Sequence, residues 1–162
     1  MHEQDIQSAK RTLEENIYAA MATADRSGQP WNSPVFVVYD EHLNFYWASA
    51  VKSHHSQNID ENPRVFLAIF NSAVPWGMGE GVFVQARAEE LTDQGEIAKA
   101  CELRRRRASK ALQPPGDFTG DRPRRIYRAT AEHIWINKDT TENGYFVDIR
   151  QEIDLESLKR IV

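Results

Sequence analysis

The sequence predicts a mainly β protein: a small antiparallel barrel of six or seven strands with helices around it. Two observations predict this class. The sequence contains about six or seven β-rich runs and only three short helical segments. In the first half, the strands follow one another through short turns. Short turns favour antiparallel pairing over βαβ units, and barrel closure removes exposed sheet edges. A chain of 162 residues suits one domain, taken as residues 1–162.

The first half alternates a helix with strands. Apolar residues at helical spacing predict an amphipathic helix ending near Asn16: Ile6, Ala9, Leu13 and Ile17. A strand at 18–24 and a Gly-Pro turn at 27–30 follow, and then a hairpin of 31–39 and 43–49.

The middle of the chain has the clearest strand. A short helix at 53–62 ends before Pro63. The run RVFLAIF at 64–70 is nearly all apolar and predicts a buried strand. Segment 71–81 contains Pro75, Gly77, Gly79 and Gly81, which predict a loop. An alternating strand follows at 82–89.

The last third contains one helix and two strands. Asp93 can cap a helix that continues towards Leu112, where a Pro-Pro-Gly sequence stops it. A polar loop at 117–125 leads to a strand at 126–137, and a short strand at 145–149 precedes the tail. The four arginines 104–107 point around most of the helix, so we expect them to form a solvated surface.

Composition and charge exclude several classes of protein. Hydrophobic residues at 41% and charged residues at 27% exclude general disorder, and a net charge of -4 argues against a nucleic-acid partner. The single Cys101, expected to be an inert core thiol, rules out an intrachain disulfide. No apolar run approaches the ~20 residues that span a membrane, and residues 1–20 are polar and acidic, unlike a secretory signal. We expect a soluble cytoplasmic protein.

Common catalytic motifs are absent from the sequence. The glycines of 77–81 precede a strand rather than a helix, which argues against a dinucleotide site and leaves a loop able to approach a ligand or a second subunit. The adjacent His54 and His55 point in different directions and have no ligand set nearby, so no metal site is expected. Hydrolase and kinase signatures are missing as well.

A group of hydroxyls and potential cations follows the second hairpin strand: Ser49, Lys52, Ser53, His54, His55 and Asn58. Ser53 can begin the helix after it, and a helix N-terminus with free N–H groups binds anions. The residues alone allow two interpretations of this group. Either they form a phosphate site, or Ser53 is only a cap and the histidines are exposed.

From Ile17 to Asn137 the chain resembles the pyridoxamine 5'-phosphate oxidase-like FMN-binding split-barrel family. The resemblance rests on three segments in order: GQPWNSPVFVVYDEHLNFYWAS, SHHSQNIDENPRVFLAIF and GVFVQARAEELTD. It implies an antiparallel split barrel that forms a homodimer, with two flavins in grooves between the subunits. It also implies that one tryptophan could line the flavin ring from the partner subunit: Trp31, Trp47, Trp76 or Trp135. Tryptophans are more often core residues than cofactor contacts.

The resemblance also implies the cofactor site. Ser49 and Ser53 occupy the positions of the threonine and the serine in the family's phosphate-binding pattern. His54 and His55 occupy the positions of its two basic residues. Imidazoles are only partly charged near pH 7, so phosphate affinity is expected to be weaker or to draw on an arginine elsewhere. The strand at 32–35 matches the segment against the flavin ring. The implied cofactor-binding residues are Asn32, Ser33, Pro34, Val35, Ser49, Ser53, His54, His55 and Asn58.

The function implied is hydride transfer between FMN and a small-molecule substrate, with no catalytic residue assigned. The chain ends in DLESLKRIV and lacks the tryptophan and arginine signature of the vitamin B6 oxidase, so oxidation of pyridoxamine phosphate itself is not expected. Three alternatives stay open: a deazaflavin-dependent reductase, a non-catalytic flavin- or haem-binding protein with His133 as the haem ligand, and an empty barrel that serves as an interaction domain.

Overall fold

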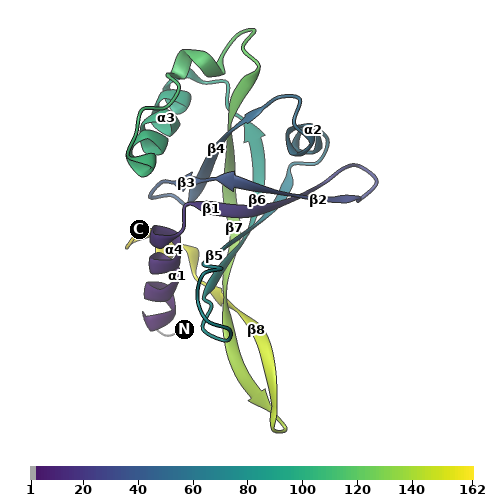
Figure 1. The fold of residues 1–162 in the computed structure, drawn as a ribbon, viewed down its shortest axis with the longest axis vertical. Helices are drawn as coiled ribbons and strands as arrows, with labels where there is room; N and C mark the ends of the chain where they lie inside the picture. The colour runs from purple at the N-terminus through teal and green to yellow at the C-terminus, as the bar shows by residue number, and fades with distance from the viewer. Residues whose placement is uncertain (1–2) are drawn as a thin grey trace.

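The computed structural model describes residues 3–162 and confirms the mainly β class (Figure 1). Within these residues, eight strands form one antiparallel sheet flanked by helices. The elements in chain order are α1 Glu3–Glu15, β1 Tyr18–Ala24, β2 Pro30–Phe36, β3 Val38–Tyr39, β4 Asn44–Ala50, α2 His54–Glu61, β5 Arg64–Phe70, β6 Gly81–Glu90, α3 Gln94–Ala108, the 3-10 turn η1 Pro115–Phe118, β7 Arg124–Glu142, β8 Tyr145–Ile153 and α4 Leu155–Lys159.

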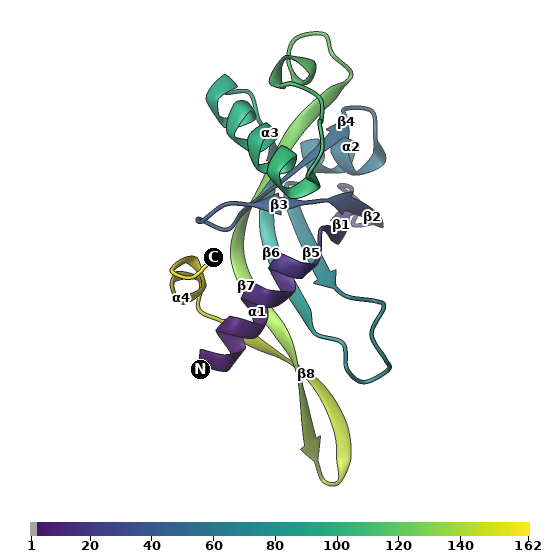
Figure 2. The same ribbon diagram turned by 60° about the vertical axis from the view of Figure 1, so that its left-hand side comes forward.

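The long strand β7 joins the parts of the sheet. The strand order is β2-β1-β5-β6-β7-β4-β3, with β8 also paired to β7. The first residues of β7 pair with β4, the middle pairs with β6, and the end pairs with β8. Figure 2 shows β7 running the length of the molecule, with β8 and the end of β7 projecting as a two-stranded ribbon.

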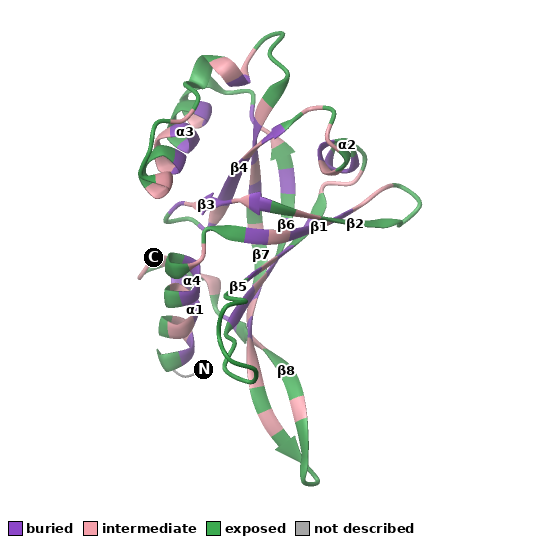
Figure 3. Cartoon of the chain, viewed as in Figure 1, coloured by how far each residue is buried: buried purple, intermediate pink, exposed green. Residues whose placement is uncertain are grey.

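Two hydrophobic cores stabilise this arrangement. The larger core lies inside the curved sheet around Trp47 and Phe45, and α1 covers it with Leu13. The smaller core lies under α3, where Ile97 meets Phe118 of η1. Figure 3 shows buried residues at the centre of the sheet and on the inner helix faces, and a largely exposed β7–β8 ribbon. No helix in residues 3–162 has both the length and the apolar character needed to cross a bilayer.

The described residues contain eight strands where six or seven were expected, because the run 31–39 is divided at Val37. β2 pairs with β1, whereas β3 pairs with β4, so the chain changes partner between them. The Val37 N–H donates to the Ile17 carbonyl at 3.0 Å at the point of change. Val37 and Val38 are both buried, so the alternation of burial is interrupted here, but the continuous apolar run at 35–39 does not reveal the break in the sequence.

The C-terminal strands are longer than the sequence pattern indicated. β7 reaches Glu142 instead of 137, and β8 reaches Ile153 instead of 149. Asn143 and Gly144 form the turn, with φ values of 51° and 82°. Asn-Gly with two positive φ values is the usual two-residue hairpin turn, a signal that the sequence analysis missed.

Two further corrections concern helices. α3 ends at Ala108 rather than near 112, because Ser109 takes the left-handed conformation at φ 50°. The tail contains α4, whose Leu158 is fully buried in the larger core.

The arginine run is not uniformly solvated. Arg104 is only 5% exposed, and its guanidinium lies 5.4 Å from the centre of the Phe118 ring. Arg107 donates to the Leu13 carbonyl at 2.7 Å. Arg105 and Arg106 are exposed and pair with Glu102, as a solvated surface requires. Arg104 differs because it shares the inner face of α3 with residues 97, 100 and 101.

Candidate functional site

Four of the expected site residues meet in one hydrogen-bonded group, which we call the serine–histidine cluster: Ser33, Ser49, Ser53 and His55. They come from β2, the end of β4, the residue before α2 and the first turn of α2. His55 lies at the centre. Its Nδ1 is 3.1 Å from Ser33 Oγ, and its Nε2 is 2.5 Å from Ser49 Oγ and 3.1 Å from Ser53 Oγ.

The start of α2 leaves its first N–H groups available. Ser53 occupies the N-cap position with extended backbone angles, but its side chain makes no capping hydrogen bond. Its Oγ instead donates to Ser56 Oγ at 2.8 Å and contacts His55. No acidic side chain lies in the first turn. An uncapped helix N-terminus beside several hydroxyls has the donors that an oxyanion requires.

The cluster carries little positive charge of its own. Burial lowers the pKa of His55, and the neighbouring charge of His54 lowers it further. A neutral imidazole has one donor and one acceptor nitrogen, so His55 can accept a hydrogen bond from a serine hydroxyl at one nitrogen and donate one at the other. These residues therefore offer an anion hydrogen bonds rather than a fixed positive charge.

Two of the residues expected on α2 lie outside the cluster. The His54 ring stacks on Trp31, with 4.2 Å between ring centres and 19° between the planes. The buried Asn58 side chain donates to Thr23 Oγ1 at 3.0 Å and so ties α2 to β1. Asn58 therefore holds the helix in place and does not extend the cluster.

The strand segment 32–35 is divided between two faces of β2. Asn32 and Pro34 are exposed, whereas Val35 is buried in the larger core. Only Ser33 reaches the cluster. Alternation along a strand causes this division, so side chains of the whole segment cannot contact one ligand surface together.

A layer of residues beneath the cluster was not predicted from the sequence. Ser56 is fully buried, and its hydroxyl is hydrogen-bonded to both Ser53 and Tyr127. Tyr127 stacks on Trp47, with ring centres 5.7 Å apart. The indole N–H of Trp47 is buried and has no hydrogen-bond partner within residues 3–162. The spacing of Ser53 and Ser56 by three was the signal available.

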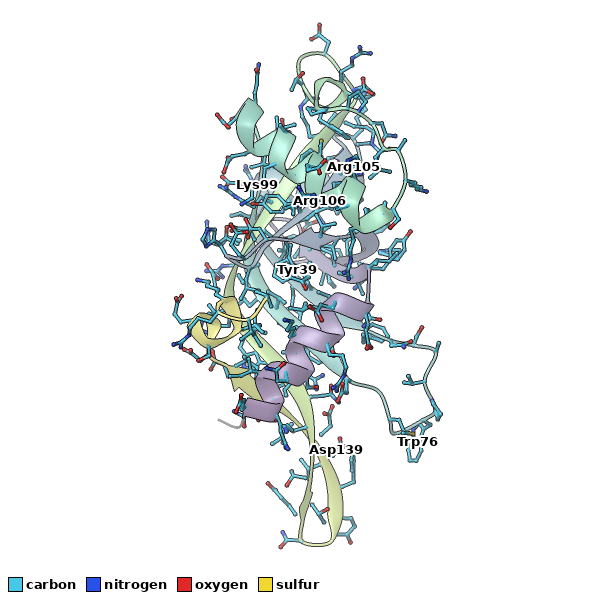
Figure 4. The ribbon with its side chains drawn as sticks, turned by 90° about the vertical axis from the view of Figure 1, so that its left-hand side faces the viewer. Tyr39, Trp76, Lys99, Arg105, Arg106 and Asp139 are labelled. Carbon is cyan, nitrogen blue, oxygen red and sulfur yellow. The ribbon has the colours of Figure 1, made fainter. Side chains whose placement is uncertain are left out.

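A second polar group lies at the opposite end of β4. The fully buried carboxylate of Asp40 accepts hydrogen bonds from the Asn44 N–H at 3.0 Å, the Tyr46 hydroxyl at 2.9 Å and Lys99 Nζ at 2.7 Å. Burial alone would raise its pKa, but the hydrogen bonds from Lys99, Asn44 and Tyr46 lower the pKa of Asp40 to about 2. Figure 4 labels Lys99 on α3. We call this group the Asp40 network.

The outer face of the sheet carries exposed and half-buried rings, which we call the aromatic face: Phe66, Phe83, His133 and Trp135. Phe66 and Trp135 are 6.2 Å apart between ring centres, and His133 stacks on Trp135 at 5.5 Å. The guanidinium of Arg150 lies 3.8 Å from the centre of the Phe83 ring. His133 Nδ1 is 2.7 Å from a carboxylate oxygen of Glu152.

The glycine-rich segment is a loop, as expected, between β5 and β6. Asn137 holds its end, donating to the Gly79 carbonyl at 3.0 Å and accepting from the Gly81 N–H at 2.6 Å. Trp76 is completely exposed and lies at the tip of the loop (Figure 4).

Comparison with known proteins identifies the family of this fold. The family model for pyridoxamine 5'-phosphate oxidase matches residues 6–138. No curated protein matches the sequence significantly.

Solved structures resemble the fold at low sequence identity. A haem-binding protein from Mycobacterium smegmatis is similar with a TM-score of 0.71 and 14% identity, over 99% of this chain but only 62% of that longer chain. An F420 reductase gives a TM-score of 0.58 at 19% identity, over 77% of this chain and 94% of that chain. The haem storage protein HutZ from Vibrio cholerae gives 0.56 at 15%, over 78% and 89%.

Proposed function

Because the chain belongs to the pyridoxamine 5'-phosphate oxidase-like family, we propose that it is an FMN-dependent oxidoreductase acting on a small organic molecule. One observation carries the proposal: Ser33, Ser49, Ser53 and His55 converge at the uncapped N-terminus of α2. Ser49, Ser53 and His55, three of the positions taken from the family's phosphate pattern, thus lie together in space, and Ser33 joins them from β2.

The residues present fit a phosphate group. Ser49 and Ser53 offer hydroxyl donors, α2 offers backbone N–H groups, and His55 offers an imidazole that can take up a proton when an anion binds. FMN supplies the hydride chemistry, whereas the protein binds and orients the cofactor. Ser33 and Ser56 would hold His55 and Ser53 in position through the hydrogen bonds already described.

We also propose a homodimer with cofactor sites between the subunits. The aromatic face supports this, because Phe66 is 39% exposed in the isolated chain and its ring lies beside those of Phe83 and Trp135. Contiguous exposed rings of this kind are typical of interaction surfaces. Analytical ultracentrifugation should give a mass near twice 18.6 kDa; a monomer at all concentrations would remove this part of the proposal.

The experiment that tests the cofactor is an absorption spectrum of purified protein after addition of FMN and removal of the excess. We expect a retained flavin band near ~450 nm, which is the cofactor's own property. A protein that retains only a deazaflavin, with its band at shorter wavelength, would assign it to the deazaflavin-dependent reductases. A protein that binds neither would contradict the oxidoreductase proposal.

A haem-binding function is the second candidate, supported by the pairing of His133 Nδ1 with Glu152. A carboxylate on Nδ1 orients a histidine whose Nε2 binds a metal, and two proteins of similar fold are described as haem-binding or haem-storing. Haem would give an intense band near ~400 nm. His133→Ala should abolish that band while Glu152→Gln weakens it; an unchanged band in H133A would exclude this ligand.

A further inference from the structure

We infer that a groove between β1, β5 and β6 is a binding site for a small organic anion, held by Arg64 and Arg87. The groove has a volume of about 590 Å³ and lies on the outer face of the sheet. A volume of this size suits a small molecule. The inference does not depend on the proposed flavin chemistry.

The strand register brings the two arginines together. Arg64 on β5 is directly opposite Arg87 on β6. The adjacent pair, Pro63 and Ala88, is joined by a backbone hydrogen bond from Ala88 N to Pro63 O at 2.8 Å. Arg64 and Arg87 are therefore a non-hydrogen-bonded pair, in which opposite Cα atoms approach to about 4.5 Å and side chains are closest.

The guanidiniums of Arg64 and Arg87 are unpaired in the described part of the chain. Within residues 3–162, the side chains of Arg64 and Arg87 make no hydrogen bond and no ion pair. Like charges directly opposite each other destabilise a sheet, and most other arginines of this chain bind a carboxylate or a carbonyl, as Arg125 and Arg128 do. An anion between the two guanidiniums would remove the repulsion and receive bidentate hydrogen bonds.

The walls of the groove are largely apolar around the two arginines. Ala22, Ala24, Pro30 and Phe66 supply an apolar surface beside the two charges. The one acidic side chain lining the groove is Glu132, and it accepts a hydrogen bond from Gln85 at 3.4 Å. Glu132 lies in the bulge of β7 opposite Gln85 and Ala86.

These walls define the ligand by its chemistry. Two guanidiniums recognise a carboxylate or a phosphate, and the adjacent apolar surface with the Phe66 ring accommodates an aliphatic or aromatic group. Gln85 and Asn62 add amide groups at the edge. The site therefore suits a small carboxylate or phosphate ester with an apolar body, rather than a bare inorganic ion.

The test is calorimetric titration of flavin-free protein with phenyl phosphate and with benzoate, at constant ionic strength. Benzamide, which has the shape of benzoate without its charge, is the control ligand. We expect R64Q/R87Q to bind both anions at least about tenfold more weakly than the native protein, which is about 1.4 kcal/mol. The matched control R105Q/R106Q removes two exposed arginines from α3, labelled in Figure 4, and should bind as the native protein does.

Three results would overturn the inference. Benzamide binding as well as benzoate would show that charge is not recognised. Binding that survives in R64Q/R87Q but is lost in S53A/H55A would place the anion at the serine–histidine cluster. Loss of the dimer in R64Q/R87Q, without any anion binding to the native protein, would show that the arginines pair with carboxylates of a second copy. Because the titration uses no FMN, failure to bind flavin has no effect on the outcome.

Discussion

The two ends of β4 carry polar groups of opposite character. At its beginning, the Asp40 network pairs a buried carboxylate with Lys99 and with donors from its own hairpin. At its end, the serine–histidine cluster joins three hydroxyls to one imidazole whose pKa is lowered, with no carboxylate and no fixed cation. The first group is electrostatically complete and stabilises the fold. In the second group, the first N–H groups of α2 receive no side-chain cap, so they can donate hydrogen bonds to a ligand.

The sharpest way to test this contrast is to remove Asp40. Asp40→Ala leaves the Tyr46 hydroxyl and the backbone N–H of Asn44 without their acceptor in a buried site. We expect a loss of about 3 kcal/mol in the free energy of unfolding, measured by urea denaturation. Glu41→Ala, next in the chain but exposed, should change it by less than about 0.5 kcal/mol. A loss in D40A as small as that of E41A would show that the network is not structural.

The next largest effect concerns binding. Ser53→Ala with His55→Ala should weaken FMN binding at least about tenfold, or about 1.4 kcal/mol, because two groups of the anion site are removed. The fold should be destabilised less than by D40A. His54→Ala is the matched control, since that ring stacks on Trp31 outside the cluster. Fluorescence titration measures the affinities, and equal affinity in S53A/H55A and native protein would refute the phosphate site.

The smallest expected effect is on pH dependence. The lowered pKa of His55 means that the folded protein without ligand favours the neutral imidazole. Its contribution to stability is therefore present above the unfolded pKa of 6.5 and is lost as the pH falls through the folded pKa. A bound phosphate favours the protonated form, so FMN affinity should rise as pH falls from about 8 to about 6.5, by about threefold to tenfold. His55→Ala should flatten the profile; a native affinity that falls over this range would contradict the assignment.

The sequence predicted the fold best where local patterns determine it. β1 and β5 begin and end as expected, because turns and Pro63 bound them sharply. The break at Val37 depends on which strand each half pairs with, which is a tertiary property. Local pattern also could not show that Arg104 would be buried against Phe118, because the contact depends on how η1 folds back against α3.

The site was predicted in part for the same reason. Ser49, Ser53 and His55 are close in sequence and fell within one motif, and Ser33 joined them through the family resemblance. His54 and Asn58 belong to the same motif, but helix geometry turns them elsewhere. The pairing of Arg64 with Arg87 follows from strand register alone, which periodicity in a single sequence does not determine.

The length of β7 also sets the order in which the chain can mature during synthesis. β4 is synthesised early, but Asn44 cannot pair with Thr130 until β7 has been synthesised. The pairing of β6 likewise requires residues of β7 up to Ile136. Until β7 leaves the ribosome, both strands present unpaired edges, which readily pair with other chains. Such distant pairings also slow the final folding step. Protection of the nascent chain therefore matters most in the interval between the synthesis of β6 and that of β7.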